Sequence, residues 1–328
     1  MLPLDGVRVL DLTRLLPGAY ATFLLASLGA EVVKIEDPRG GDPMRNMTRA
    51  RAAFERLNAG KRSATLNLRS PDAAHVLDAL ASRADALVES FRPSTAKRLG
   101  VDAATLVARH PRLVCASISG FGQDGPYADV AAHDINYQAL AGLVMPPRVP
   151  GPLVGDIGAA MEAALKIVAA LFARSRTGRG AHVDVSIHEA ALAWSMFPTT
   201  GGLEGPRYNL YESADGKWLA LGALEDKFWV AFCERLGLPI AATVDDVRRM
   251  MKSRTRDEWM AVFAGVDACL TTVHDANDVE ADPHLAVRGA VTQPRRPVPE
   301  LGADTDALLE EAGIDVDRRA SLRRAGVI

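Results

Sequence analysis

Short apolar runs and amphipathic stretches alternate along the first 120 residues. Apolar residues recur at helical spacing over residues 19–29 and 71–84, and the short runs between such stretches have the length and composition of buried strands. The predicted strands span residues 7–12, 31–36, 63–68, 85–90 and 112–122. Because strand–helix–strand units of this spacing form right-handed crossovers, they favour a parallel sheet. The pattern therefore predicts an α/β protein with a doubly wound, Rossmann-like open sheet, in which ligands bind at the carboxyl ends of the strands.

Changes in composition along the chain predict two domains. We expect a large α/β domain over residues 1–195, followed by a linker rich in glycine and proline over 196–210. A smaller α+β domain is predicted for 211–285, where Asp-Gly-Lys separates two β-like runs as in a hairpin. Residues 286–328 are expected to form a linker and a charged helical tail that returns to the large domain.

Bulk properties exclude several classes of protein. The 328-residue chain is 48% apolar, enough for a substantial core, and its formal net charge of -3 gives no case for binding nucleic acid or a membrane surface. It shows neither a signal-peptide pattern nor an apolar run of ~18 residues, so we expect a soluble, cytoplasmic protein. The three cysteines are scattered without a Cys-x-x-Cys pair, and histidine, cysteine and carboxylates do not cluster at ligand spacing. We therefore expect no disulfide framework and no metal site.

Two common nucleotide-binding motifs are missing. The turn after the first strand reads Asp-Leu-Thr-Arg-Leu-Leu-Pro-Gly in place of Gly-x-Gly-x-x-Gly, which disfavours a nicotinamide-dependent dehydrogenase. The chain also lacks Gly-x-x-x-x-Gly-Lys-Ser/Thr, which argues against a P-loop enzyme.

The stretch 132–166 carries the most distinctive chemistry. A His133-Asp134 pair and Asp156 lie on either side of a short loop rich in proline and glycine, each at the predicted start of a helix. Asp156 is expected at the N-cap or one residue before it, where the helix dipole would favour its carboxylate form. Each feature alone is compatible with an ordinary cap acid or a histidine packed at a helix end. Together they could face one carbon from opposite sides, one group taking a proton and the other giving one.

Cations near the ends of predicted strands suggest anion binding. Lys61 and Arg62 follow Asn-Ala-Gly in a turn, and Arg92 comes shortly after the strand that ends at Glu89-Ser90. The guanidinium group suits phosphate through its fork of donors, and lysine adds a point charge. Any one of these residues could equally be a solvated surface cation.

Several of these segments resemble one family. The runs GVRVLDLTRLLPGAY, LNAGKRSATLNL, ESFRPSTAKRLGV, HDINYQALAG and PLVGDIG follow one another in this order along the chain. They are similar to the family III CoA-transferase (CaiB/BaiF) superfamily, in a resemblance that covers nearly the whole chain, and most to its α-methylacyl-CoA racemase branch. The resemblance implies an acyl-CoA substrate, no cofactor beyond coenzyme A (CoA) as part of that substrate, and an interlocked homodimer. It implies His133, Asp134, Asp156 and Glu225 as catalytic residues, with Glu225 reaching the partner chain's site. It also implies CoA-binding roles for Lys61, Arg62, Glu89, Arg92 and Tyr137.

Three activities stay open at this level. A racemase would use His133, helped by Asp134, and Asp156 as two bases that remove and return the proton α to a thioester. A CoA-transferase would use Asp156 as a nucleophile that forms an acyl anhydride and then an aspartyl-CoA thioester. A CoA-binding protein without catalysis is the third possibility. His133 and Glu225 favour the racemase, whereas Ala132 in place of the branch's usual glycine and the short loop 144–153 depart from its pattern.

Overall fold

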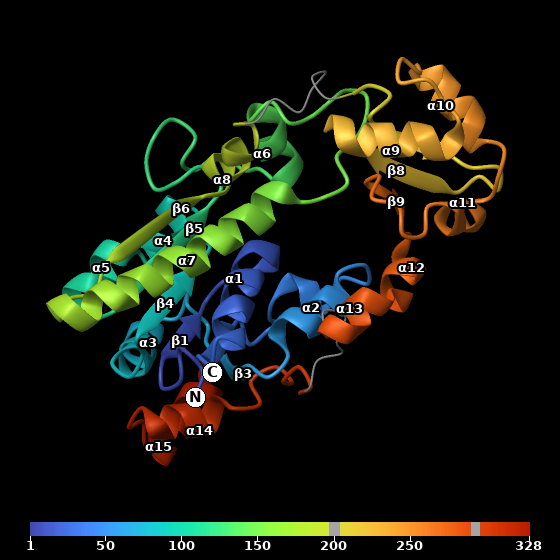
Figure 1. The fold of residues 1–328 in the computed structure, drawn as a ribbon. Helices are drawn as coiled ribbons and strands as arrows, with labels where there is room; N and C mark the ends of the chain where they lie inside the picture. The colour runs from blue at the N-terminus through green and yellow to red at the C-terminus, as the bar shows by residue number, and fades with distance from the viewer. Residues whose placement is uncertain (197–203, 290–295) are drawn as a thin grey trace. The chain divides into compact units, whose positions relative to one another are not determined.

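The chain folds into two compact units in a computed structural model that describes residues 1–196, 204–289 and 296–328. One unit comprises Met1–Met196 with Gln293–Ile328, and the other comprises Phe197–Thr292. Figure 1 labels the elements of both units, which are described separately below.

A six-stranded parallel sheet forms the centre of the first unit. Its strand order is β3-β2-β1-β4-β5-β6. The strands are β1 (Arg8–Asp11), β2 (Glu31–Glu36), β3 (Arg62–Thr65), β4 (Ala86–Glu89), β5 (Val114–Ser119) and β6 (His182–Ser186). The predicted doubly wound α/β sheet is confirmed, and its order reverses between β1 and β4, where ligands of such sheets bind.

Helices cover both faces of this sheet (Figure 1). On one face α1 (Leu15–Ser27), α7 (Val154–Thr177) and α8 (Ile187–Trp194) pack small residues such as Ala159 and Ala163 against valines of the sheet. The other face contributes to a second core with α3 (Ala73–Ala81), α5 (Ala103–Arg109) and the C-terminal helices. Shorter elements of the unit are η1 (Pro43–Arg45), α2 (Arg51–Asn58), α4 (Pro93–Leu99) and α6 (Asp134–Leu140).

The C-terminal segment belongs to the first unit. Helix α14 (Thr305–Glu311) buries Leu308 and Leu309 in the core shared with α3, and α15 (Val316–Arg324) follows it. The Asp304 carboxylate accepts a hydrogen bond from the Ser63 N–H (2.8 Å), which joins the segment to edge strand β3. Edge strand β3 is thereby covered, as exposed sheet edges usually are.

The second unit is a small α+β structure. The antiparallel strands β7 (Tyr208–Glu212), β8 (Trp218–Gly222) and β9 (Leu270–Thr272) pair in that order. The predicted hairpin is present, although β7 begins inside the range predicted as linker. The helices of the unit are α9 (Asp226–Leu236), α10 (Val244–Met251), α11 (Arg256–Val262), α12 (Ala276–Ala281) and α13 (Pro283–Arg288). Trp229 and Phe232 stack in its core with ring centroids 5.5 Å apart.

Within the described residues, no helix is long and apolar enough to cross a membrane.

Candidate active site

A cavity of about 410 Å³ lies at the carboxyl ends of β4 and β5. Four residues singled out from the sequence line it together: Arg92, His133, Tyr137 and Asp156. They come from α4, α6 and α7, three elements that start at this edge of the sheet. We call this space the acid–base cavity.

Asp156 lies in the first turn of α7, because the helix begins at Val154 and not at the predicted cap position. Its backbone N–H donates to Asp134 Oδ1 (2.9 Å) from the neighbouring helix α6. Burial and repulsion by the Asp134 carboxylate raise the pKa of Asp156 to about 7. The expectation that the helix dipole would keep Asp156 in its carboxylate form is therefore wrong, since desolvation and the adjacent charge outweigh the dipole.

Asp134 supports Asp156 and not His133. Its carboxylate is buried, and its two oxygens accept hydrogen bonds from the Asp156 N–H and from the Gln138 side-chain amide. The same Gln138 amide donates to the carbonyl of Pro152 (2.8 Å), which ties the loop before α7 to α6. The predicted assistance of His133 by Asp134 is accordingly replaced by a structural role in placing Asp156.

His133 is the N-cap residue of α6 and is exposed to the cavity. Its backbone N–H donates to Asn136 Oδ1 (3.0 Å), which fixes the start of the helix. Tyr137, one turn further, is buried and donates its hydroxyl to the carbonyl of Ala132 (3.1 Å). Burial raises the pKa of Tyr137 to about 12. Gly120 allows this ring to approach the backbone, because a Cβ there would lie 2.5 Å from the tyrosine oxygen.

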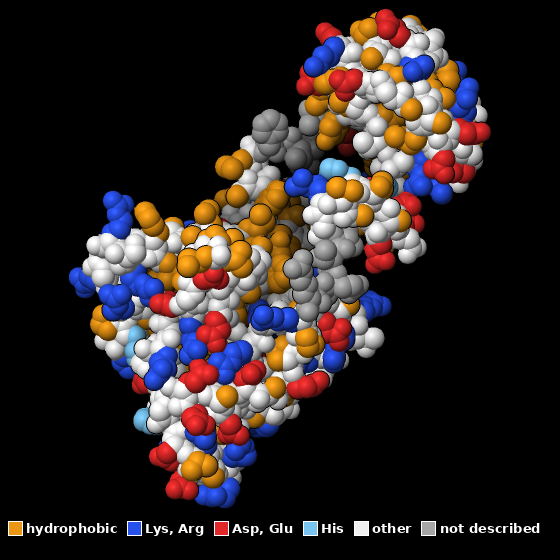
Figure 2. Space-filling view, turned by 60° about the horizontal axis from the view of Figure 1, so that its bottom comes forward, with side chains coloured by type: hydrophobic (Ala, Val, Ile, Leu, Met, Phe, Trp, Pro, Cys, Tyr) orange, Lys and Arg blue, Asp and Glu red, His pale blue; other side chains and the backbone are white. Residues whose placement is uncertain are grey.

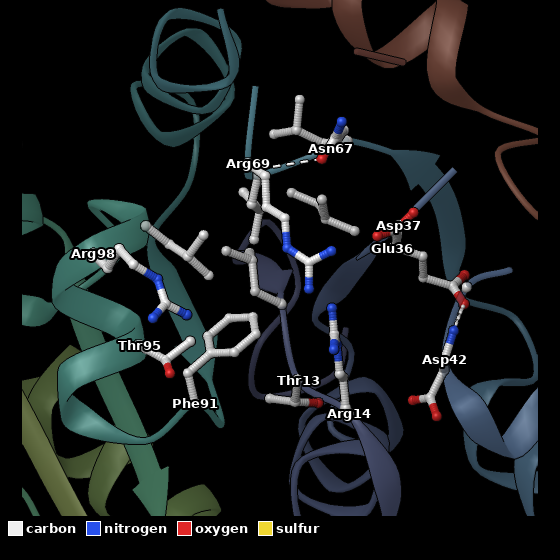
Figure 3. Close-up of a pocket in the computed structure, with 16 residues that line it drawn as sticks. Thr13, Arg14, Glu36, Asp37, Asp42, Asn67, Arg69, Phe91, Thr95 and Arg98 are labelled. Atoms are coloured by element: carbon white, nitrogen blue, oxygen red, sulfur yellow. Dashed lines mark hydrogen bonds between the residues drawn. The ribbon is translucent and has the colours of Figure 1, made fainter. Parts of the chain in front are cut away.

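A second cavity of about 80 Å³ lies at the carboxyl ends of β1 to β4 (Figure 3). Arg14, Arg69 and Arg98 line it, and we call it the arginine cavity. Figure 3 shows the guanidinium groups of Arg14 and Arg69 turned toward each other, with Arg98 on the other side of the space. Arg14 and Phe91 also line the acid–base cavity, so the two spaces adjoin.

The three arginines were missed in the sequence, although a signal for them exists. Arg14 follows β1 by three residues and Arg69 follows β3 by four, so both lie where a parallel sheet binds ligands. Among the residues that the structure describes, no carboxylate forms an ion pair with Arg14, Arg69 or Arg98. Such unpaired guanidinium groups are available to an anionic ligand.

Lys61 and Arg62, predicted to bind CoA, lie elsewhere. The Lys61 ammonium is fully buried and donates to Asp11 Oδ2 (3.1 Å), Thr22 Oγ1 (2.8 Å) and Asn58 Oδ1 (2.8 Å), and burial lowers its pKa to about 8. Arg62 forms ion pairs with Glu31 and Glu311, each at 2.9 Å. Neither side chain lines either of these two cavities, so their contact with CoA stays a prediction that this geometry does not support.

The two remaining predicted residues have separate places. Glu89 is buried at the end of β4, where Oε2 accepts the Phe91 N–H (2.7 Å) and shapes the turn that carries Phe91 and Arg92. Burial raises the pKa of Glu89 to about 7, and the residue lines neither cavity. Glu225 caps α9 in the second unit and is exposed. Among the described residues, His, Cys, Asp and Glu form no group that could hold a metal ion.

A parallel sheet with two cavities at the carboxyl ends of its strands defines a doubly wound α/β protein, a class that binds its ligands at this edge. Comparison with known proteins identifies the family: the chain belongs to CoA-transferase family III, whose description matches residues 4–305. It is 33% identical to human α-methylacyl-CoA racemase over 94% of this chain and 93% of that protein. It is also 32% identical to succinyl-CoA–D-citramalate CoA-transferase of Chloroflexus aurantiacus, over 88% of this chain and 83% of that one.

Solved structures agree with this family. A CaiB/BaiF family protein from Brucella suis superposes with a TM-score of 0.82 at 25% identity, covering 95% of this chain and 99% of that chain. Rv3272 from Mycobacterium tuberculosis gives the same TM-score at 26% identity, covering 94% of this chain and 99% of that chain. The relatives include both racemases and CoA-transferases, so family membership does not choose between the two activities.

Proposed function

We propose that the protein is a racemase of 2-methylacyl-CoA thioesters that works by two-base transfer of the α-proton. The observation that carries the proposal is the acid–base cavity, which His133 and Asp156 both line and in which burial raises the pKa of Asp156 to about 7. A group that titrates near the working pH can both take and give a proton. The thioester acidifies the α-proton, so one residue removes it and the other returns a proton to the opposite face.

The arginine cavity accounts for the nucleotide end of such a substrate. Coenzyme A carries phosphates. Arg14, Arg69 and Arg98 supply guanidinium donors that form no ion pair in the described chain, in a cavity that Glu36, Asp37 and Asp42 also line. Because Arg14 and Phe91 belong to both cavities, one extended ligand could occupy both, with the thioester beside His133 and Asp156. The proposal therefore keeps Arg92 and Tyr137 as substrate contacts and adds the three arginines. Glu89 acts on Arg92 indirectly, through the turn that its hydrogen bond to the Phe91 N–H shapes.

A CoA-transferase is the second candidate, because transferases of the same similarity occur among the relatives. Its nucleophile would be the Asp156 carboxylate. His133 in the same cavity favours the racemase, because nucleophilic transfer by Asp156 needs no second acid–base group there.

Two further features of the racemase proposal concern the assembly. We propose that the chain acts as a homodimer, as the resemblance implies, and that Glu225 contributes to the site of the partner chain. Exposed apolar side chains on α7 and α8 of the first unit support self-association.

Proton exchange in heavy water tests the proposal. One enantiomer of a 2-methylacyl-CoA is incubated with wild type, His133→Ala and Asp156→Asn, and deuterium at the α-carbon is followed by NMR. We expect deuterium uptake with epimerisation in wild type and a loss of at least about 100-fold in both variants. Arg39→Gln, which changes an exposed arginine outside both cavities, serves as the control and should keep full activity.

The opposite result is equally informative. If several such substrates show no exchange while hydroxylamine traps an acyl group on Asp156, the racemase proposal is wrong and the transferase is correct. Binding of CoA without either reaction would leave the non-catalytic CoA-binding protein.

A further inference from the structure

The turn between β1 and α1 holds a non-glycine residue in a strained conformation. Leu15 has a φ of 64°, in the left-handed region that β-carbons disfavour by roughly 1–2 kcal/mol. Residues held in this way persist only where their surroundings impose the conformation, and they cluster at functional sites. Leu15 follows Arg14 directly, and both residues line the acid–base cavity.

A buried ion pair imposes this conformation. The Leu15 N–H donates to the Asp42 carboxylate, at 3.2 Å from Oδ2 and 3.4 Å from Oδ1. Lys34 Nζ lies 3.1 Å from Asp42 Oδ2 and donates to the carbonyl of Thr13 (3.1 Å). Lys34 and Asp42 are almost completely buried. Away from solvent, Lys34 therefore holds the turn at Thr13 directly and at Leu15 through Asp42.

The rest of the turn is fixed as tightly. Asp11 Oδ1 accepts from the Thr13 N–H (3.0 Å) and from its hydroxyl (2.6 Å), and Ser90 Oγ accepts from the Arg14 N–H (2.9 Å). Gly18 lets the first turn of α1 approach Thr13, because a Cβ there would lie 2.1 Å from the threonine Cβ. The Arg14 backbone is therefore held on both sides, while its side chain is exposed.

Arg14 occupies the junction of the two cavities. It lines both of them, and its guanidinium carbon lies 5.5 Å from the centre of the Phe91 ring, the other residue that both cavities share. In Figure 3 its guanidinium group points into the arginine cavity toward Arg69. A small rotation at Leu15 would carry this side chain away from the junction.

We propose that the Lys34–Asp42 ion pair holds the Leu15 backbone in the left-handed conformation and thereby positions Arg14. The Arg14 guanidinium group then contacts the ligand at the junction where the ligand passes from one cavity to the other. Lys34 lines neither cavity, and Asp42, although it lines the arginine cavity, is almost completely buried; both are inferred to act through Arg14. The inference rests on the proposed function only in taking a CoA thioester as the ligand. It explains why two opposite charges are buried in a place where apolar residues would pack without a desolvation cost.

A double-mutant cycle tests the proposal. The dissociation constant of CoA is measured by calorimetry for wild type, Arg14→Ala, Asp42→Asn and the double variant, with thermal unfolding recorded for each. We expect Arg14→Ala to weaken binding on the order of tenfold, as for the loss of a charge-assisted contact. Asp42→Asn should weaken binding by a similar factor in wild type and by less than about twofold when Arg14 is already alanine.

Controls separate positioning from general destabilisation. Asp85→Asn breaks the 2.8 Å ion pair with Arg174, which lies outside both cavities, and should leave CoA binding unchanged. If Asp42→Asn alone does not fold, the variant Lys34→Met/Asp42→Asn takes its place in the same cycle. This variant removes both charges of the pair, so neither charge is left buried without its partner.

Each outcome decides the matter. Equal weakening by Asp42→Asn with and without Arg14, or no weakening at all, would overturn the positioning role while CoA binding by wild type still upholds the proposed ligand. Failure of wild type to bind CoA would instead overturn the proposed function.

Discussion

Asp156 shows how one neighbour changes the chemistry of a carboxyl group. Its N–H is anchored by Asp134, and that contact brings a second carboxylate close to its side chain. Burial raises the pKa of Asp156 to about 7, and the Asp134 charge that this contact brings close adds to the shift. An aspartate in the first turn of a helix is usually stabilised as the anion, so the opposite shift here supports the proposed proton-transfer role.

The raised pKa predicts that Asp156→Asn stabilises the fold above neutral pH. A carboxyl group whose pKa rises from 3.8 to about 7 on folding binds more protons in the folded state, so its contribution to stability falls as pH rises from about 4 to about 7 and then levels off. Each pKa unit corresponds to about 1.4 kcal/mol, which gives an upper bound of about 4 kcal/mol at pH 8. Asparagine carries no charge and avoids this cost.

Urea unfolding of wild type and Asp156→Asn at pH 4 and pH 8 measures this difference. The variant should be more stable than wild type at pH 8 and lose that advantage at pH 4. Asp37→Asn, which neutralises a partly exposed carboxylate in the other cavity, is a suitable control and should show no such pH-dependent gain. Equal stability of the two proteins at both pH values would contradict the raised pKa.

At the scale of elements, the ion pairs of Arg62 join the C-terminal helix to the sheet. Arg62 on β3 and Arg8 on β1 both contact Glu31 on β2 and Glu311 on α14, at 2.7–2.9 Å. A network that shares its charges loses less side-chain entropy per contact than isolated pairs do. These four residues therefore hold the C-terminal segment in place together with Leu308 and Leu309.

We expect Arg62→Gln to lower the free energy of unfolding by about 1–2 kcal/mol and to leave CoA binding unchanged. The matched control is Arg51→Gln, which breaks the exposed pair with Glu55 within one helix and should cost less than about 0.5 kcal/mol. Urea midpoints and calorimetry with CoA give the two quantities. A large loss of CoA affinity in Arg62→Gln would restore the role that the sequence suggested for this residue.

The parallel sheet and its helices were predicted well from the sequence, whereas the directions of the cationic side chains were not. The periodicity of apolar residues predicts the buried parallel strands and the long helix α7. One cavity is lined by Arg92, His133, Tyr137 and Asp156, because each lies near the start of a helix at the same sheet edge. Lys61 follows a turn in the same way, but its side chain enters the core to pair with Asp11. The position of a residue in the sequence predicts the end of an element but not the direction of a long side chain. For this reason Lys61 was named from the sequence as a candidate cation, and Arg14, Arg69 and Arg98 were not.

At the scale of the whole molecule, helices α7 and α8 of the first unit expose several large apolar side chains. Met161, Leu165 and Phe172 on α7 are each more than half exposed, as are Trp194 at the end of α8 and Met196 after it. Figure 2 shows hydrophobic side chains gathered on one face of this unit. Contiguous apolar patches of this kind usually mark a protein–protein interface.

We therefore expect the 35.0-kDa chain to run as a dimer of twice that mass in size-exclusion chromatography with light scattering. Leu165→Glu/Phe172→Glu should shift the population to monomer, because burying two unpaired carboxylates costs several kcal/mol. Val316→Glu on α15, where the wild-type side chain is 66% exposed, is the matched control and should leave the mass unchanged. If Glu225 completes the site of the partner chain, the monomeric variant should also lose α-proton exchange while still binding CoA through the arginine cavity of each chain. A monomeric variant with full exchange activity would show that one chain carries the complete site and that Glu225 is not required from a partner.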